Sequence, residues 1–318
     1  MTTPDLPDQP ATTADLTRAG WKRNDIRDAC GTGVLRRVVR GVYVPVGLED
    51  TLDLRARSIA KVVGPSHVLI DRSAAWLHGV STLTLAETET LAPIETAALR
   101  GRNPTDRRDV VGRSRDLGVD DVMVVAGVRV TTPLRTALDL GCELRRREAM
   151  AGMNDLARLH RFTSLDLAAE LPRFKGRRGV VQLKDLVPLV RHVMESPRES
   201  WTWLAIADAG LPLPECQLWV DVDGVPTYRL DFGYPVQKVA VEYDGVAAHL
   251  AAPEQRRHDE ERRRRLQLLG WTVIVVRSGD FTGRSLDRWL DELRAALRGG
   301  YSPLRFAPTR REASPYSA

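Results

Sequence analysis

The chain has 318 residues, of which 43% are hydrophobic and 28% are charged. This composition is typical of soluble globular proteins, and the length favours two or three domains. Lys and Arg outnumber Asp and Glu by 47 to 42, a mild basic excess that suits a polyanionic partner without proving one. The three cysteines are far apart and form no CxxC pair, which excludes a disulfide framework and a zinc site. No apolar run approaches the roughly 20 residues of a membrane span, and the N-terminus has no apolar signal core, so we expect a cytoplasmic protein that does not contact a membrane.

Residues 12–45 predict two short helices followed by a β-hairpin. The first helix begins at a capping residue, Thr12 or Thr13, and ends at Gly20. The second helix ends before "VLRRVVRGVYVP", which alternates as a hairpin does. This is the plan of a winged helix-turn-helix, whose second helix enters a DNA groove and whose wing contacts phosphates; the alternative is a small α/β fold with a basic surface. The candidate DNA-binding residues are Lys22, Arg23, Arg27, Arg36, Arg37 and Arg40.

Residues 51–195 predict an α+β domain without obvious chemistry. "LDLRARSIAKVVG" and "DRSAAWLHGV" are typical of helices, and "DVMVVAGVRVTTPLRTALDLG" predicts two strands and a helix opened by Thr132 and Pro133. Between them, "LRGRNPTDRRDVVGRSRD" is polar, rich in arginine and irregular, and "LPRFKGRRGV" is typical of a linker with a glycine turn. We interpret His67 and His78 as packing residues rather than ligands.

From residue 196 the pattern predicts the order α-β-β-β-α-β. A helix with Pro197 near its start ends at Gly210, and two strands meet at Asp223-Gly224, a strong hairpin signal. A third strand, "KVAVEYDG", precedes a helix that ends at Gly270. The apolar run "TVIVVRS" then predicts a buried strand of the parallel kind.

These strands carry more negative charge than a buried sheet should. Side chains alternate along a strand, so Glu242 and Asp244 share one face with Lys238, and Asp231 on the neighbouring strand can lie beside Glu242. Crowded carboxylates repel one another, and a cation usually stabilises such a cluster. Mg²⁺ (or Mn²⁺) suits carboxylate oxygens and phosphates. A metal held there could polarise a phosphodiester and generate hydroxide from bound water.

The same segment resembles the core of the PD-(D/E)xK nuclease superfamily, and in particular its very-short-patch-repair (Vsr) endonuclease-like branch. The similarity runs from about residue 196 to about residue 297. The most specific parts are "EYDGVAAH" and the spacing of Asp259, Arg262, Leu266, Gly270 and Trp271. The resemblance implies a restriction-endonuclease-like αβββαβ core that hydrolyses DNA phosphodiester bonds.

The resemblance also implies roles for single residues. Asp231 and Glu242 would be the metal-binding carboxylates, with the backbone carbonyl of Tyr243 as a third metal contact. Glu199 falls where the first helix of such folds supplies an acidic residue. His249 corresponds to a histidine near the scissile phosphate, although a place in a surface loop fits it equally well.

Two further points concern the support of this site. Asp259 and Arg262 look like the helix pair that holds it together, and an inward structural ion pair is an equal alternative. The superfamily lysine two residues after the second carboxylate is here Asp244, which cannot stabilise phosphate charge. Lys238 could supply a displaced cation, or it could point to solvent. The departure puts cleavage in doubt more than the fold.

The N-terminal run "TRAGWKRNDIRDACGTGVLRRVVRGVYVP" is similar to the winged-helix domain of AbiEi-type antitoxins from type IV toxin–antitoxin systems. "DRSAAWLHGV" and "VTTPLRTALDLG" resemble the middle part of the same architecture. In that family the winged helix binds promoter DNA and represses its own operon. The resemblance therefore implies DNA docking.

Together these patterns predict a multidomain protein of α/β and α+β class. The expected segments are a winged helix-turn-helix domain over residues 1–50, an α+β middle domain over 51–195, a Vsr-like nuclease-type domain over 196–298 and a tail over 299–318. Our first hypothesis is a DNA-binding protein with a Mg²⁺-dependent endonuclease domain. The alternative, which Asp244 favours, is a non-catalytic antitoxin-like transcriptional repressor. Double-stranded DNA is the expected partner, with a cognate toxin or a second copy of the chain as further candidates.

Overall fold

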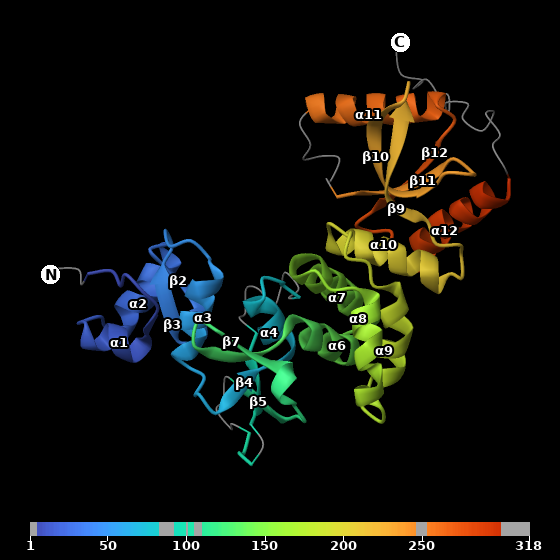
Figure 1. Cartoon of the computed structure of the whole chain (residues 1–318). Helices are drawn as coiled ribbons and strands as arrows, with labels where there is room; N and C mark the ends of the chain where they lie inside the picture. The colour runs from blue at the N-terminus through green and yellow to red at the C-terminus, as the bar shows by residue number, and fades with distance from the viewer. Residues whose placement is uncertain (1–4, 83–91, 100, 105–109, 246–252, 300–318) are drawn as a thin grey trace, which may run out of the picture. The chain divides into compact units, whose positions relative to one another are not determined.

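The computed structural model describes residues 5–82, 92–99, 101–104, 110–245 and 253–299, with the backbone alone described over 253–256. The chain divides into two compact units, Met1–Pro197 and Arg198–Ala318, which we call unit 1 and unit 2. Figure 1 shows both, coloured from blue at the N-terminus to red at the C-terminus. Each unit is described by itself.

Unit 1 begins with a small helical and sheet segment. Its elements are β1 (Ala11–Thr12), α1 (Thr13–Arg18), α2 (Arg23–Gly31), β2 (Leu35–Val39) and β3 (Val42–Pro45), and its sheet has the order β1-β3-β2. Thr12 caps α1: its hydroxyl accepts from the Asp15 N–H at 3.1 Å, and the Asp15 carboxylate accepts from the Thr12 N–H at 2.9 Å. Trp21, Ile26 and Leu35 are buried between the helices and the hairpin. The two helices, the hairpin and the cap at Thr12 are as predicted.

A five-stranded sheet with the order β6-β5-β4-β8-β7 follows in unit 1. The strands are β4 (His67–Leu69), β5 (Ile94–Ala98), β6 (Val110–Ser114), β7 (Val122–Val125) and β8 (Val128–Thr131). Helices α3 (Leu52–Ala60) and α4 (Asp71–Leu77) complete this part, and their apolar side chains share one core with β2, β3, β4 and β8. Strand β6 lies in the arginine-rich stretch that we expected to be irregular, so that prediction was wrong for residues 110–114. His78 is a packing residue as predicted: it is buried, and its Nε2 lies 2.7 Å from the Thr131 carbonyl oxygen.

Helices form the rest of unit 1. They are α6 (Pro133–Glu143), α7 (Arg146–His160), α8 (Ser164–Glu170) and α9 (Val180–Leu186), with short 3-10 turns η1 (Val119–Asp121), η2 (Leu171–Phe174) and η3 (Val187–Leu189). Helix α6 starts with the predicted Thr132 cap and Pro133. The expected linker at 171–180 is instead a folded connection, because Phe174 is buried within it. Gly179 has a φ of +80°, and a Cβ there would lie 2.1 Å from the Cys142 carbonyl oxygen, so the connection packs tightly on α6.

Unit 2 contains a four-stranded sheet with the order β12-β11-β10-β9. Its elements are α10 (Pro197–Asp208), β9 (Glu215–Val222), β10 (Val225–Tyr234), β11 (Val239–Asp244), α11 (Pro253–Leu268), β12 (Thr272–Arg277) and α12 (Gly283–Arg298). Asp223 and Gly224 both have positive φ, at 53° and 79°, as a two-residue hairpin turn requires. Strand β12 pairs parallel to β11. The element order and this pairing are as predicted.

The fold is therefore a mixed α/β, multidomain one, as expected at that level. Assignment of residues 11–45 to the winged-helix class and of unit 2 to the restriction-endonuclease class stays a prediction. Among the helices of the described ranges, none combines the length and the apolar character that a bilayer crossing demands.

Candidate functional site

A basic hollow lies between α2 and the β2–β3 hairpin. Arg23 and Arg27, one turn apart on α2, and Arg37 on β2 line it. Its volume is about 230 Å³, and its remaining lining includes Ile26 and Tyr43. The Arg37 guanidinium carbon lies 5.7 Å from the centroid of the Tyr43 ring, which orients this side chain. Three of the six predicted DNA-binding residues thus meet at one place.

The other three basic residues are placed differently. Lys22 at the start of α2 and Arg40 in the hairpin turn are exposed. Arg36 lies on the opposite face of β2 from Arg37, as strand alternation requires. Its Nη2 donates to the Leu48 carbonyl at 3.0 Å. Arg36 does not line the basic hollow, although it and Arg37 both border a second cavity. Arg36 is therefore directed away from the hollow that Arg37 lines.

In unit 2, three predicted acids are brought together. Strands β10 and β11 are antiparallel with Phe232 opposite Val241, so Asp231 and Glu242 are the next facing pair. The Asp231 carboxylate accepts a hydrogen bond of 2.9 Å from the Tyr243 backbone N–H, on the neighbouring strand. Glu199, buried on α10, is close enough to Asp231 for its charge to raise the Asp231 pKa.

Each of these acids has a partner within the protein. Both carboxylate oxygens of Glu242 accept from Arg262 on α11, at 2.8 and 2.6 Å, and Arg262 also donates to the Arg229 carbonyl at 2.8 Å. Glu199 accepts from the Gln217 side-chain amide at 3.0 Å. Burial, together with the charges of Glu199 and Glu242, raises the pKa of Asp231 to about 6, against the lowering effect of the Tyr243 N–H and of Arg262. Protonation of the Asp231 carboxyl group would thus reduce the charge repulsion among the three acids.

This arrangement does not fit a divalent cation as it stands. The described residues include no group of three or more His, Cys, Asp or Glu side chains that could hold a metal ion. A cation at Glu242 would have to displace a guanidinium that makes two charge-assisted hydrogen bonds. Metal binding by Asp231, Glu242 and the Tyr243 carbonyl stays a prediction, and it requires Arg262 to release Glu242.

The remaining predicted residues of this site make other contacts. Lys238 precedes β11 with a φ of 52°, and its ammonium donates to the Leu269 carbonyl at 3.0 Å; it is about 13 Å from Glu242 along the strand direction. Asp244 accepts from Arg263 at 3.1 Å. Asp259 is half-buried on α11. The pKa of Arg262 is raised mainly by Glu242, and the charges of Asp231 and Asp259 add to this effect. His249 lies outside the described residues.

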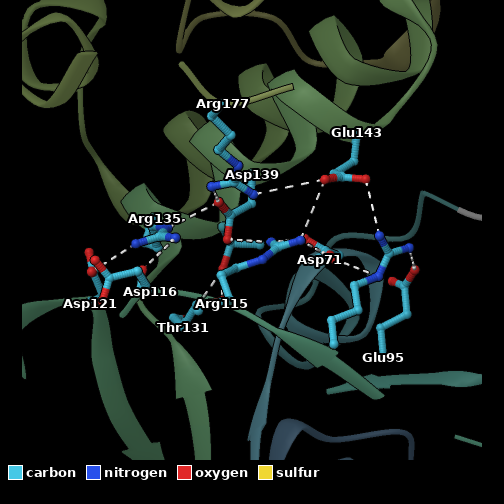
Figure 2. Close-up of polar contacts among 12 residues, drawn as sticks. Asp71, Glu95, Arg115, Asp116, Asp121, Thr131, Arg135, Asp139, Glu143 and Arg177 are labelled. Atoms are coloured by element: carbon cyan, nitrogen blue, oxygen red, sulfur yellow. Dashed lines mark hydrogen bonds and ion pairs between the residues drawn. The ribbon is translucent and has the colours of Figure 1, made fainter. Parts of the chain in front are cut away.

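A third polar cluster, in the middle of unit 1, was missed by the sequence reasoning (Figure 2). Asp139 of α6 is fully buried and contacts three arginines: it accepts from Arg135 Nε at 3.0 Å and from Arg177 Nη1, and its Oδ2 lies 2.9 Å from Arg115 Nη1. A second buried acid, Asp121, accepts at one oxygen from Arg135 at 2.8 Å. We call this set of buried acids and the arginines around them the arginine network.

Other contacts extend the network to both sides. Asp121 also accepts from Arg173 at 2.6 Å and from the Gly118 N–H at 2.7 Å. Burial opposes ionisation of Asp121, but these hydrogen bonds and the charges of Arg135 and Arg173 outweigh it and hold the pKa below its usual range. At the other side Asp71 pairs with Arg115, and burial raises the Asp71 pKa to about 6 despite Arg115.

Little in the sequence points to this network. Its members come from α4, the loop after β6, η1, α6, η2 and the segment after η2, so only Arg135 and Asp139, at helical i and i+4 spacing, are local partners. The density of arginine in 99–116 and 171–180 is the one available signal, and our sequence interpretation was an irregular stretch and a linker. Arginines in a folded domain can equally be partners of buried acids.

Comparison with known proteins identifies the segment that carries this network. Residues 67–189 match the family model described as the AbiEi antitoxin C-terminal domain. An uncharacterized protein of Mycobacterium tuberculosis strain CDC 1551 / Oshkosh and one of strain ATCC 25618 / H37Rv are each 34% identical to the chain over 152 residues, 48% of the chain. The matched part is 56% of each relative, so the chain spans little more than half the length of the curated relatives it matches. The comparisons give no support for a Vsr-like endonuclease in residues 196–298, and they associate residues 67–189 with an antitoxin domain.

Proposed function

We propose that this protein is a non-catalytic, antitoxin-type DNA-binding regulator, in which residues 11–45 bind duplex DNA. The observation that carries the proposal is the convergence of Arg23, Arg27 and Arg37 from α2 and β2 on one basic hollow. The match of residues 67–189 to an AbiEi antitoxin domain supports the same reading. It favours the regulator over the nuclease, which was our first hypothesis.

The geometry suggests how the DNA is held. In a winged helix-turn-helix the second helix lies in the major groove, with its N-terminal residues at the base edges. Here that helix is α2, and Lys22 and Arg23 stand at its start. Arg37 and the exposed Arg40 of the hairpin would contact backbone phosphates, which set affinity and register rather than sequence preference.

Arg36 and Arg37 offer a matched test, because they are neighbours on one strand with opposite orientations. Binding of the full chain to a duplex from its own promoter is measured by fluorescence anisotropy over a salt series. We expect Arg37→Gln to lower affinity and to reduce the slope of log K against log salt by about 1, as loss of one phosphate contact does. Arg36→Gln and the exposed Arg57→Gln should leave both quantities unchanged. Equal effects of the Arg36 and Arg37 substitutions would contradict the assigned face.

A reporter assay separates regulation from simple DNA affinity. A transcriptional fusion of that promoter should be repressed by the wild-type chain and released by Arg23→Gln, because a bidentate arginine–guanine contact contributes about 1–3 kcal/mol of discrimination. Unchanged repression by the variant would mean that α2 does not read the operator. Protection of cells from a co-expressed cognate toxin tests the antitoxin part of the proposal separately.

The metal-dependent nuclease remains a second candidate, and one observation favours it: Glu199 and Glu242 are near enough to Asp231 for their charges to raise its pKa. A plasmid nicking assay with Mg²⁺ or Mn²⁺ compares the wild type with Asp231→Ala and Glu242→Ala. Cleavage that both substitutions abolish would establish the nuclease. Absence of cleavage by a preparation that still binds DNA in a salt-dependent way would leave the regulator alone.

A further inference from the structure

An open cavity of about 1040 Å³ lies over the arginine network of unit 1. Its walls come from the end of β6 and the loop after it, from α6, and from η2 and the segment after it. The cationic side chains that line it are Arg113, Arg115, Arg135, Arg173, Lys175 and Arg177, against two acidic ones, Asp116 and Glu143. This is the largest concentration of positive charge around any of the cavities described above.

The acids of the network are more deeply buried than the arginines that contact them. The side chains of Asp121 and Asp139 are 4% and 0% exposed. Among their partners, Arg173 and Arg177 are 46% and 21% exposed, and Arg115 and Arg135 are 8% and 6% exposed. Between them, Asp121 and Asp139 contact Arg115, Arg135, Arg173 and Arg177. Two buried carboxylates therefore hold four guanidinium groups in fixed positions.

Some cationic donor groups at the cavity have no acceptor among the described residues. No described residue forms a hydrogen bond or an ion pair with the Lys175 ammonium, which is exposed. Nη2 of Arg177 is buried and has no hydrogen-bond acceptor within the described ranges; Glu143 Oε1 lies 3.9 Å from it. A stabilising role alone does not account for such a set, since buried ion pairs contribute little net stability.

We propose that this cavity binds the phosphate groups of a small polyphosphate or nucleotide ligand. Guanidinium forks bind phosphate oxygens bidentately, and forks that are already oriented lose little side-chain entropy when a ligand arrives. Several converging cations match the charge of a polyphosphate better than the single charge of a carboxylate. The volume is of the size that accommodates nucleotide-sized molecules.

Glu143 is the acid that such a ligand would meet first. It lines the cavity, its side chain is 31% exposed, and it lies 3.3 Å from Arg113, 3.5 Å from Arg115 and 3.9 Å from Arg177. A bound phosphate would compete with its carboxylate for those arginines. Removing the Glu143 charge should therefore strengthen phosphate binding, whereas removing a cation at the rim should weaken it.

The experiment is calorimetric titration of the full chain with inorganic triphosphate and, in parallel, with ATP, in the absence of divalent metal. We expect binding by the wild type, at least about tenfold weaker binding after the combined change Arg173→Gln and Lys175→Gln, and tighter binding after Glu143→Gln. Arg178→Gln is the matched control, since Arg178 is exposed in the same segment but does not line the cavity. Near-identical thermal unfolding of the variants excludes misfolding as the cause.

A third arm uses the promoter duplex to identify the source of the phosphate. Triphosphate binding that depends on Arg173 and Lys175 and is insensitive to Arg37→Gln supports a small ligand, independently of the DNA-binding proposal. If the two cavity substitutions weaken duplex binding while triphosphate does not bind, the phosphates belong to DNA and the small-ligand site is overturned. A third outcome is that none of the cavity substitutions changes the binding of duplex DNA or of triphosphate at millimolar concentration. That outcome would overturn phosphate recognition by this cavity.

Discussion

Asp121 in unit 1 is buried and Asp231 in unit 2 is partly buried, yet the pKa values of these two carboxyl groups move in opposite directions. Asp121 is surrounded by Arg135, Arg173 and a backbone N–H, and its pKa is lowered although burial acts the other way. Burial raises the pKa of Asp231 to about 6, and neighbouring acids add to that effect. The sign of the shift therefore follows the ratio of cations to acids around each group rather than burial alone.

This contrast has a functional meaning. In the arginine network, acids are the inner partners and arginines face the cavity, so the surface offered to a ligand is cationic. In unit 2, three acids lie together with one close arginine, Arg262, which pairs with Glu242. Asp231 and Glu199 accept hydrogen bonds from the Tyr243 N–H and the Gln217 amide instead. The first arrangement suits an anionic ligand. The second is held together by an internal cation that a metal would have to replace.

The largest expected effect comes from removing the shared acid of the network. Asp139→Ala leaves Arg115, Arg135 and Arg177 without the carboxylate they have in common. Loss of one partner of a buried ion pair typically costs about 3–5 kcal/mol, because the charge that remains is not compensated. Urea unfolding should show this loss, and hydrogen exchange of the α6 backbone amides should locate it in unit 1.

A matched control for that measurement is Asp53→Ala on α3. Asp53 pairs with Arg57 at a site where both side chains are more than half exposed. Exposed pairs at this spacing contribute only about 0.3–0.5 kcal/mol. Comparable losses for the Asp139 and Asp53 variants would mean that the network is not a buried, cooperative unit.

The second prediction tests unit 2. Arg262→Met keeps a side chain of similar length but removes the group that binds both oxygens of Glu242. We expect the unfolding free energy of unit 2 to fall by about 3 kcal/mol, since the buried Glu242 loses its guanidinium partner. Combining the change with Glu242→Gln should recover most of the loss, because the double variant contains no unpaired charge. Additive losses in the double variant would contradict a direct pairing.

The elements of the fold were predicted where short-range chemistry determines them. The Thr12 cap, the Thr132-Pro133 helix start and the Asp223-Gly224 turn are each set by a few neighbouring residues, and the structure places all three as expected. Segment 171–180 was wrongly assigned as a linker. There the order depends on Phe174 and on partners far away in the chain, which no local pattern shows.

The candidate sites were likewise predictable only where a local pattern determines them. Register reasoning correctly placed Asp231 beside Glu242, since strand alternation carries that information. Two details of unit 2 were not accessible: Arg262 forms its hydrogen bonds with Glu242, twenty residues away, and Lys238 lies before the strand rather than on it. The arginine network was invisible for the same reason, because sequence spacing does not reveal which arginine meets which buried acid.

The smallest predicted effect concerns pH and Asp231. Its pKa in the folded protein is about 6, against an ordinary value of 3.8, so between these values the folded state binds more protons than the unfolded state. Stability contributed by this group is therefore fully present below about pH 4 and is lost as the pH rises through 6.

Asp231→Asn keeps an acceptor for the Tyr243 N–H but cannot ionise. Its free energy of unfolding, relative to that of the wild type, should therefore rise by about 2 kcal/mol between pH 4.5 and pH 7. Urea unfolding of both proteins across this range measures the difference, in which the titrating groups away from this cluster cancel. A difference that does not vary with pH would show that Asp231 titrates normally, and the proposed crowding with Glu199 and Glu242 would then have no energetic consequence.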